Sequence, residues 1–306
     1  AELAHGFAQR GHQVWIAGAN ELAWGEENSP LAWAHVSTFH EDITRWLDQL
    51  KQTKEKVFFP ELDLIMIRTN PGRDKNRSWG HDVVLDLSTW AQKNGIVVLN
   101  PPEMLRKSSS KMYLQDFPQD IRPRSIISRH KQDIKDFVFA QQNPCILKPL
   151  RGTGGSNVFI IRPNDYSNLN QIIEVVSAND FIIAQEYIPQ AEVGDTRVLM
   201  LQGEPIVING KLAAVMRLRQ GEDLRSNVSV GGKASEPQNI QNIYAVLEKV
   251  QPKLKEDGVF LAGLDVIGNK IVEVNVFSPG GIRDAGFFAQ RDFLSMIIDK
   301  AEDCLL

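Results

Sequence analysis

The sequence predicts a mixed α/β and α+β protein, and three observations lead to this fold class. Short apolar runs that fit buried strands alternate with helical patterns over residues 1–102, as in open α/β sheets. Strand patterns separated only by turns follow over residues 189–218, which is typical of an antiparallel meander. A chain of 306 residues is also long enough to divide into two or three domains.

In the first predicted domain, residues 1–102, helices connect the strands of an open α/β sheet. We expect helices over 1–10 and 83–93, and strands over 14–17, 62–67 and 96–99. A strand normally precedes the first helix of such a unit, so we expect the first strand of this sheet to be missing. The segment Asn100-Pro101-Pro102 ends the last of these strands and marks the boundary.

The second predicted domain, residues 103–188, has strands on both sides of a helix. Serines 108–110 are suitable N-cap residues for a helix that begins near Lys111. Beyond it we expect a helix over 131–140 and strands over 126–127, 145–148, 158–161 and 181–188.

A glycine-rich loop follows Lys148, between two of these strands. Gly152, Gly154, Gly155 and Ser156 let backbone N–H groups approach an anion closely. No helix pattern begins directly after the loop, so it matches neither a P-loop nor a dinucleotide-binding fingerprint. An ordinary hairpin turn explains the glycines alone, but the lysine beside them favours phosphate binding.

The third predicted domain, residues 189–306, contains the meander and two further helices. We expect strands over 198–201, 206–208 and 213–218, and helices over 240–256 and 287–304. Residues 220–233 are polar and rich in glycine and serine. A loop of this length is often an active-site lid, so we expect a mobile lid here; the alternative is a surface loop.

Two apolar runs around Gly268-Asn269-Lys270 predict a β-hairpin. Glu273 and Asn275 are two residues apart, so both side chains leave one face of the second strand, while the valines at 272, 274 and 276 can be buried on the other. Carboxylate and amide oxygens on a rigid strand suit Mg²⁺. The alternative is a surface hairpin with solvated acids.

Asp265 joins this candidate metal site only if the hairpin has the right register. A two-residue loop places Asp265 opposite Val272, whereas a three-residue loop over 268–270 with a bulge places it opposite Glu273. We expect the three-residue loop, and a two-residue loop would count against the metal site.

Composition excludes several classes of protein. The formal net charge is −4, with 34 Lys and Arg against 38 Asp and Glu, which argues against a nucleic-acid or anionic membrane partner. No apolar run is long enough to span a bilayer, and no signal peptide is visible. Cys145 and Cys304 lie far apart without metal-ligand spacing, which favours reduced thiols and a cytoplasmic location.

Six motifs, taken together, resemble the ATP-grasp superfamily of ligases, and within it the bacterial glutathione synthetases. They are Lys111 and the segments 148–155, 185–189, 194–197, 225–232 and 264–279. The resemblance implies an ATP-grasp fold that holds ATP between two α+β domains, after an N-terminal open α/β domain. It also implies that ATP phosphorylates a carboxylate and that an amine attacks the acyl phosphate, which yields an amide, ADP and phosphate.

The resemblance also implies a role for each matched residue. Lys111 and Lys148 match lysines that contact the ATP phosphates, Glu186, Tyr187 and Ile188 match the segment beside adenine, and Asp195 matches a position near the ribose. Asp265, Glu273 and Asn275 match ligands of Mg²⁺, for which Mn²⁺ is an alternative. Arg197, Arg217 and Arg225 match residues that stabilise the transferring phosphoryl group, and Asn227, Ser278, Pro279 and Gly280 match the substrate region.

The favoured substrates are γ-glutamylcysteine and glycine. The chain has Gly280-Gly281 where Thr-Cys is common in the family, so an alternative keeps the reaction but changes the peptide or amino-acid pair. A second alternative is a nucleotide-binding module without catalysis. The expected partners are small molecules, with no nucleic acid and no membrane, and a homo-oligomer is consistent with the family.

Overall fold

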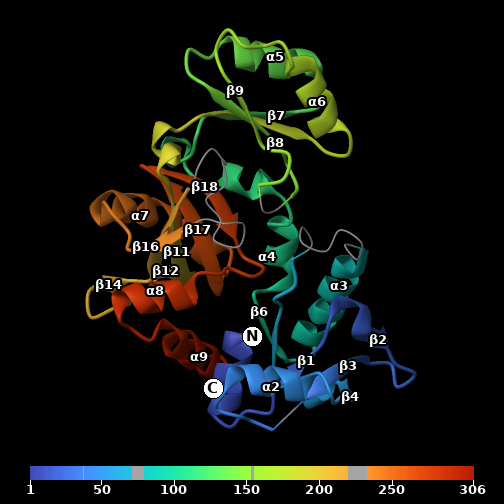
Figure 1. The fold of residues 1–306 in the computed structure, drawn as a ribbon. Helices are drawn as coiled ribbons and strands as arrows, with labels where there is room; N and C mark the ends of the chain where they lie inside the picture. Colours follow the sequence, from blue (N-terminus) through green and yellow to red (C-terminus); the bar gives the residue numbers. More distant parts are fainter. Residues whose placement is uncertain (37, 71–78, 153–154, 220–232) are drawn as a thin grey trace.

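The computed structural model describes residues 1–36, 38–70, 79–152, 155–219 and 233–306. The sheet that carries β7, β8 and β9 lies at one end of the molecule, with the first hundred residues at the other and the two chain ends side by side (Figure 1). Short 3₁₀-helices occur at Ala19–Glu21, Phe59–Glu61, Lys111–Asp116, Gln119–Ile121 and Pro189–Glu192. No helix within the described ranges is both long and apolar enough to cross a bilayer.

The first hundred residues contain two separate sheets. A parallel pair is connected by a long helix, as predicted, through β5 (Leu64–Met66), α3 (Trp79–Lys93) and β6 (Val97–Leu99). An antiparallel sheet is made of β1 (Trp15–Ile16), β2 (Leu22–Trp24), β3 (Pro30–Val36) and β4 (Glu55–Phe58). The predicted strand over 14–17 therefore does not extend the parallel sheet, because its residues pair with the end of β3. The remaining helices are α1 (Glu2–Gln9), α2 (Ile43–Leu50) and α4 (Pro102–Lys107).

A four-stranded antiparallel sheet follows, with two helices packed on it. The strand order is β7 (Ser125–Ser128), β10 (Ile182–Glu186), β8 (Cys145–Pro149) and β9 (Phe159–Ile161). The helices are α5 (Lys131–Phe139) and α6 (Leu169–Ser177). Ile134 and Ile173 from the helices pack with Leu147 and Ile182 from the strands in one buried cluster, so this sheet has its own apolar core.

The largest sheet holds the C-terminal strands. Its order is β16 (Lys233–Ser235), β15 (Ala214–Leu218), β11 (Gly194–Leu201), β17 (Leu261–Ile267) and β18 (Lys270–Asn275), with β12 (Glu204–Pro205) paired to β11. A separate hairpin joins β13 (Val207–Ile208) and β14 (Lys211–Leu212). The helices are α7 (Ile240–Glu256), α8 (Ile282–Ala289) and α9 (Phe293–Asp303).

The predicted single helix over 287–304 is wrong. The backbone at Gln290 adopts a left-handed conformation with φ 52°, which ends α8. The side chain of Asp292 then accepts a hydrogen bond from the Ser295 amide at 3.0 Å and caps the start of α9. Two local signals therefore divide the apolar stretch into two helices.

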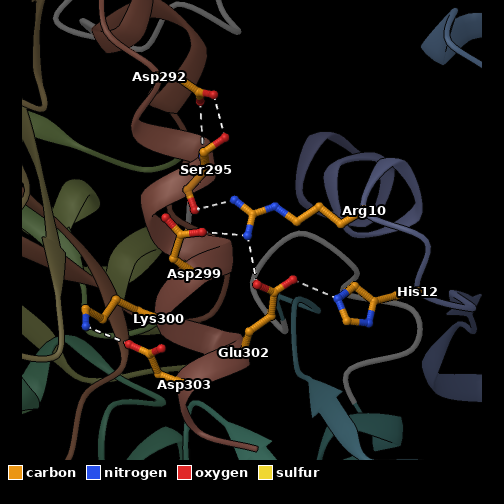
Figure 2. Close-up of polar contacts among 8 residues, drawn as sticks. All are labelled: Arg10, His12, Asp292, Ser295, Asp299, Lys300, Glu302 and Asp303. Carbon is orange, nitrogen blue, oxygen red and sulfur yellow. Dashed lines mark hydrogen bonds and ion pairs between the residues drawn. The ribbon is translucent and has the colours of Figure 1, made fainter.

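The first hundred residues contact the C-terminal part both in the interior and at the surface. In the interior, the Asn100 side chain donates to the carbonyls of Leu261 and Val276 at 2.8 and 2.7 Å. At the surface, Arg10 Nη1 contacts the carboxylates of Asp299 at 2.6 Å and Glu302 at 2.8 Å, as Figure 2 shows. The surface ion pairs join the two ends of the chain.

Candidate active site

The site is built on one face of the largest sheet. The register places Arg197 of β11 opposite Asp265 of β17, and Asp265 opposite Glu273 of β18. On the other side of β11, Asp195 stands opposite Arg217 of β15. Because residues two apart on a strand share a face, all five charged side chains form one row across four strands.

The hairpin between β17 and β18 differs from the prediction. Ile267 pairs with Lys270, so the loop has two residues and the predicted three-residue loop is wrong. A bulge nevertheless restores the predicted pairing, because the register shifts after Val266 and Asp265 still pairs with Glu273. Val272 is the residue without a partner in this register.

Four members of the row form a buried network of ion pairs, namely Arg197, Asp265, Asp195 and Arg217. Arg197 binds both carboxylate oxygens of Asp265, with Nη2 2.9 Å from Oδ2. Arg217 contacts Asp195 through Nε at 3.0 Å and through Nη2, and its Nη2 also lies 2.8 Å from Asp265 Oδ2. All four side chains are at most 10% exposed, and the alternating charges offset the cost of burying them.

The network shifts the protonation equilibria of its members. Burial alone would raise the pKa of Asp265, but the charges of Arg197 and Arg217 outweigh it and lower that pKa. For Arg217, Asp265 and Asp195 outweigh burial and raise the pKa of the guanidinium. Asp265 is therefore an anion and Arg217 a cation at neutral pH.

Two lysines lie beside the acidic end of the row. Lys111 donates through Nζ to the carbonyl of Gly152 at 2.6 Å, and its Nζ lies 3.5 Å from Glu273 Oε1. Burial, and then the neighbouring charge of Lys111, lower the pKa of Lys148 to about 8. The structure thus brings both predicted phosphate-binding lysines to the predicted metal ligands.

A cavity of about 520 Å³ joins the glycine-rich loop to β18. Its lining includes Lys111, Gly152 and Ser156 on one side, and Glu273, Asn275 and Ser278 on the other. Val272 and Val274 also line it, so of the three valines expected to be buried only Val276 is fully so. The described part of the lining does not include Glu186, Tyr187, Ile188 or Asp195.

The segment predicted to lie beside adenine continues from β10. The Glu186 amide donates to the Arg124 carbonyl at 2.9 Å, and the Tyr187 amide donates to the Pro144 carbonyl at 3.1 Å. Ile188 accepts a hydrogen bond at its carbonyl from Ala191. Three predicted site residues, Gly154, Arg225 and Asn227, lie outside the described residues, as do residues 220–232 of the predicted lid.

The predicted substrate loop contacts residues from two other parts of the chain. Arg68 donates through Nη2 to the Pro279 carbonyl at 3.2 Å, and Arg197 Nη1 lies 3.5 Å from the Gly280 carbonyl. Burial lowers the pKa of Arg68 to about 10, and no carboxylate within the described residues pairs with it. Burying a cation is costly unless other groups compensate it.

Sequence reasoning assigned no role to Arg68. The available signal was its position two residues after β5, because ligands bind at the carboxyl ends of parallel strands.

The predicted metal ligands are oxygen donors on the neighbouring strands β17 and β18. Among the described residues, no group of three His, Cys, Asp or Glu side chains could hold a metal ion. The predicted set instead offers two carboxylates and the side-chain amide of Asn275. The Nδ2 of this amide donates a hydrogen bond to the Gly263 carbonyl at 3.4 Å. Mg²⁺ usually takes one or two carboxylates together with phosphate oxygens and water, so this donor set suits Mg²⁺ bound with ATP.

The fold has counterparts among solved structures. It is similar to the solved structure of an ATP-grasp ligase, PsnB, in complex with a precursor variant, Mg and ADP. The TM-score is 0.61 with 16% identity, and the match covers 100% of this chain and 94% of the other. The predicted ATP-grasp fold is therefore confirmed.

The family follows from sequence comparison. Residues 1–106 match the N-terminal domain, and residues 110–288 the ATP-grasp domain, of prokaryotic glutathione synthetase. The chain is 34% identical to glutathione synthetase of Gloeobacter violaceus over 92% of its length and 84% of the relative's. It is 31% identical to that of Vibrio cholerae over 90% and 83%. The chain belongs to the prokaryotic glutathione synthetase family and is an ATP-dependent ligase.

Proposed function

We propose that this chain joins γ-glutamylcysteine to glycine with ATP and Mg²⁺, and releases glutathione, ADP and phosphate. The observation that carries the proposal is the row of acids and arginines across the largest sheet, next to Lys148 and to Lys111, which lines the cavity. Phosphoryl transfer depends mainly on positioning and on neutralising charge, and these residues supply both signs of charge.

Lys111, Lys148 and the glycine-rich loop would hold the phosphates of ATP. Asp265, Glu273 and Asn275 would hold Mg²⁺, or Mn²⁺ in its place; the bound cation would supply positive charge to the β- and γ-phosphates. The short distance between Lys111 and Glu273, 3.5 Å, supports one shared site for phosphate and metal. Glu186, Tyr187 and Ile188 would contact adenine.

Arg197 and Arg217 would neutralise the charge that develops on the transferring phosphoryl group and on the acyl phosphate. Arg225 and Asn227 belong to the same proposal. Ser278, Pro279 and Gly280 would contact the substrates. Their neighbour Arg68 would bind a carboxylate of the dipeptide, because it is a buried cation that lies against this loop.

The chain would act as three domains, residues 1–102, 103–188 and 189–306. Cys145 and Cys304 are both free thiols, which supports a reducing compartment such as the cytoplasm.

Light scattering in solution would test the homo-oligomer that the family suggests.

The test is ADP release from Mg·ATP with γ-glutamylcysteine and glycine supplied separately and together. We expect release only with both substrates, and one glutathione for each ADP. Release with another amino acid in place of glycine, but not with glycine, would overturn the substrate assignment. No release despite tight ATP binding would overturn the catalytic proposal.

Arg68 allows a separate test of the dipeptide site. Arg68→Ala should raise the KM for γ-glutamylcysteine about 10- to 100-fold, since a hydrogen-bonded charge is worth about 1.5–3 kcal/mol. The KM for ATP should stay within about twofold. Equal increases in both constants would argue against a specific dipeptide contact.

A further inference from the structure

Asp257 lies directly after α7 and receives three side chains from its surroundings. Its Oδ2 accepts a hydrogen bond from the Tyr113 hydroxyl at 2.8 Å. The ammonium groups of Lys107 and Lys253 each lie 3.0 Å from its Oδ1. Burial alone would raise the pKa of Asp257, but the hydrogen bonds from these three side chains outweigh burial and lower that pKa. Asp257 is therefore an anion at neutral pH and is held through both of its oxygens.

Tyr113 belongs to the same short 3₁₀-helix as Lys111. Tyr113 is only 3% exposed, and its ring packs edge-on against Phe117 with the ring centroids 5.2 Å apart. At the start of the helix, the Lys111 amide donates to the Leu150 carbonyl at 3.1 Å. The Tyr113 hydroxyl therefore ties the helix that carries Lys111 to the end of α7.

Helix α7 packs in turn on the sheet that carries the predicted metal ligands. Leu247 and Leu254 of α7 lie in one buried cluster with Leu264 of β17. Because a buried cluster is closely packed, the helix and the sheet keep a fixed relative position. Asp257 is therefore a fixed point beside the sheet.

The position of Lys111 depends on such a fixed point, because lysine carries its charge on a flexible stem. Lys111 Nζ donates to the Gly152 carbonyl at 2.6 Å and lies 3.5 Å from Glu273 Oε1. We propose that Tyr113 and Asp257 are positioning residues, whose hydrogen bond holds the 3₁₀-helix where Lys111 reaches the phosphates of ATP. This inference rests on the proposed function, which assigns Lys111 to those phosphates.

The test replaces Tyr113 with phenylalanine, which keeps the ring and removes only the hydroxyl. The KM for ATP should rise about 3- to 10-fold, as expected for the loss of one hydrogen bond. The affinity for AMPPNP, a non-hydrolysable ATP analogue, should fall by the same factor in calorimetry. The KM for γ-glutamylcysteine should stay within about twofold, because the change acts through Lys111.

A double-mutant cycle separates action through Lys111 from a direct contact of Tyr113, which itself lines the cavity. In Lys111→Met protein, Tyr113→Phe should change the AMPPNP affinity by at most about twofold. A full loss in both backgrounds would overturn the proposal, because Tyr113 would then act without Lys111.

Tyr244→Phe is the matched control. Tyr244 lies on α7 and packs, partly buried, against the same apolar cluster that contains Tyr113. Its KM for ATP and its AMPPNP affinity should stay within about twofold of wild type, so a general effect of removing a tyrosine hydroxyl near this core would be visible.

An unchanged AMPPNP affinity in a Tyr113→Phe protein with a lower Tm would make the hydrogen bond merely structural and overturn the proposal. Should Tyr113→Phe fail to fold, Asp257→Asn removes the charge but keeps an acceptor for the hydroxyl. It should weaken AMPPNP binding in the wild-type background and change it by at most about twofold in Lys111→Met protein.

Failure of the proposed function gives a different result. A Lys111→Met protein that binds AMPPNP as tightly as wild type would remove Lys111 from the phosphate site, and this inference with it. Weakened binding in Lys111→Met, together with unchanged binding in Tyr113→Phe, would overturn this inference alone.

Discussion

Replacing Lys148 with methionine should make the free protein more stable while it weakens nucleotide binding. Burial, and then the charge of Lys111, lower the pKa of Lys148 from 10.5 to about 8, so the folded protein holds this charge at a cost. At about 1.4 kcal/mol per pKa unit, the cost approaches about 3 kcal/mol. The side chain keeps partial access to solvent, which screens its charge, and we expect a gain of about 1–3 kcal/mol for Lys148→Met at pH 7.

The gain should depend on pH in a defined direction. Below pH 8, Lys148 is protonated in both the folded and the unfolded state, so the whole cost is present. Between pH 8 and 10.5 the folded protein loses the proton first, and the wild type becomes relatively more stable. The difference between the two proteins should therefore shrink over this window and vanish above it.

Urea unfolding at pH 7, 8, 9 and 10 measures this difference, and calorimetry with ADP measures binding. We expect the ADP affinity to fall roughly 10- to 100-fold, because a hydrogen bond to a charged group is worth about 1.5–3 kcal/mol. Lys300→Met, at an exposed ion pair with Asp303, is the control and should leave the free energy of unfolding essentially unchanged. A Lys148→Met protein that is less stable than wild type at pH 7 would refute the reasoning.

Three further predictions concern the sheet and the chain ends. Glu273→Gln should abolish ADP production without unfolding the protein, since Glu273 is half-buried at an open cavity; turnover near the wild-type rate would remove it from the metal site. Gly263→Ala should cost about 1–3 kcal/mol in thermal unfolding and lower kcat, because a Cβ there would lie 2.9 Å from Arg197 Cδ and 2.9 Å from Pro279 Cβ. An alanine variant with unchanged kcat would show that Arg197 tolerates displacement. Arg10→Ala should cost only about 0–1 kcal/mol in urea unfolding, because its ion pairs at the chain ends are partly exposed; a loss above about 2 kcal/mol would mean that this contact holds the domains together.

Much of the site could be predicted from local pattern. The side-chain period of a strand is two, so Glu273 and Asn275 had to share a face once β18 was recognised. The same rule applies to Asp195 and Arg197 on β11. The glycine-rich loop after Lys148 was recognisable because glycine permits backbone conformations that other residues avoid.

Predictions from local sequence pattern were wrong where the same short sequence fits more than one structure. The three-residue hairpin loop was wrong because a bulge inside β18 supplies the extra residue instead, and periodicity does not tell these two solutions apart. Strands β2 and β4 escaped prediction because they have only three and four residues, and the seven-residue strand β3 was missed as well. Their pairing partners, rather than their own composition, stabilise them.

The sequence by itself determined the class of the fold, the order of the motifs and which charged residues share a strand face, because these depend on neighbours along the chain. Only the tertiary structure decided which faces meet. It brings Arg68 to Pro279, 211 residues away, and seats Asn100 against Leu261 and Val276. It also pairs Asp195 with Arg217 through a hydrogen bond. Such contacts depend on strand register and on the balance between desolvation and charge pairing, which residues distant in sequence establish together.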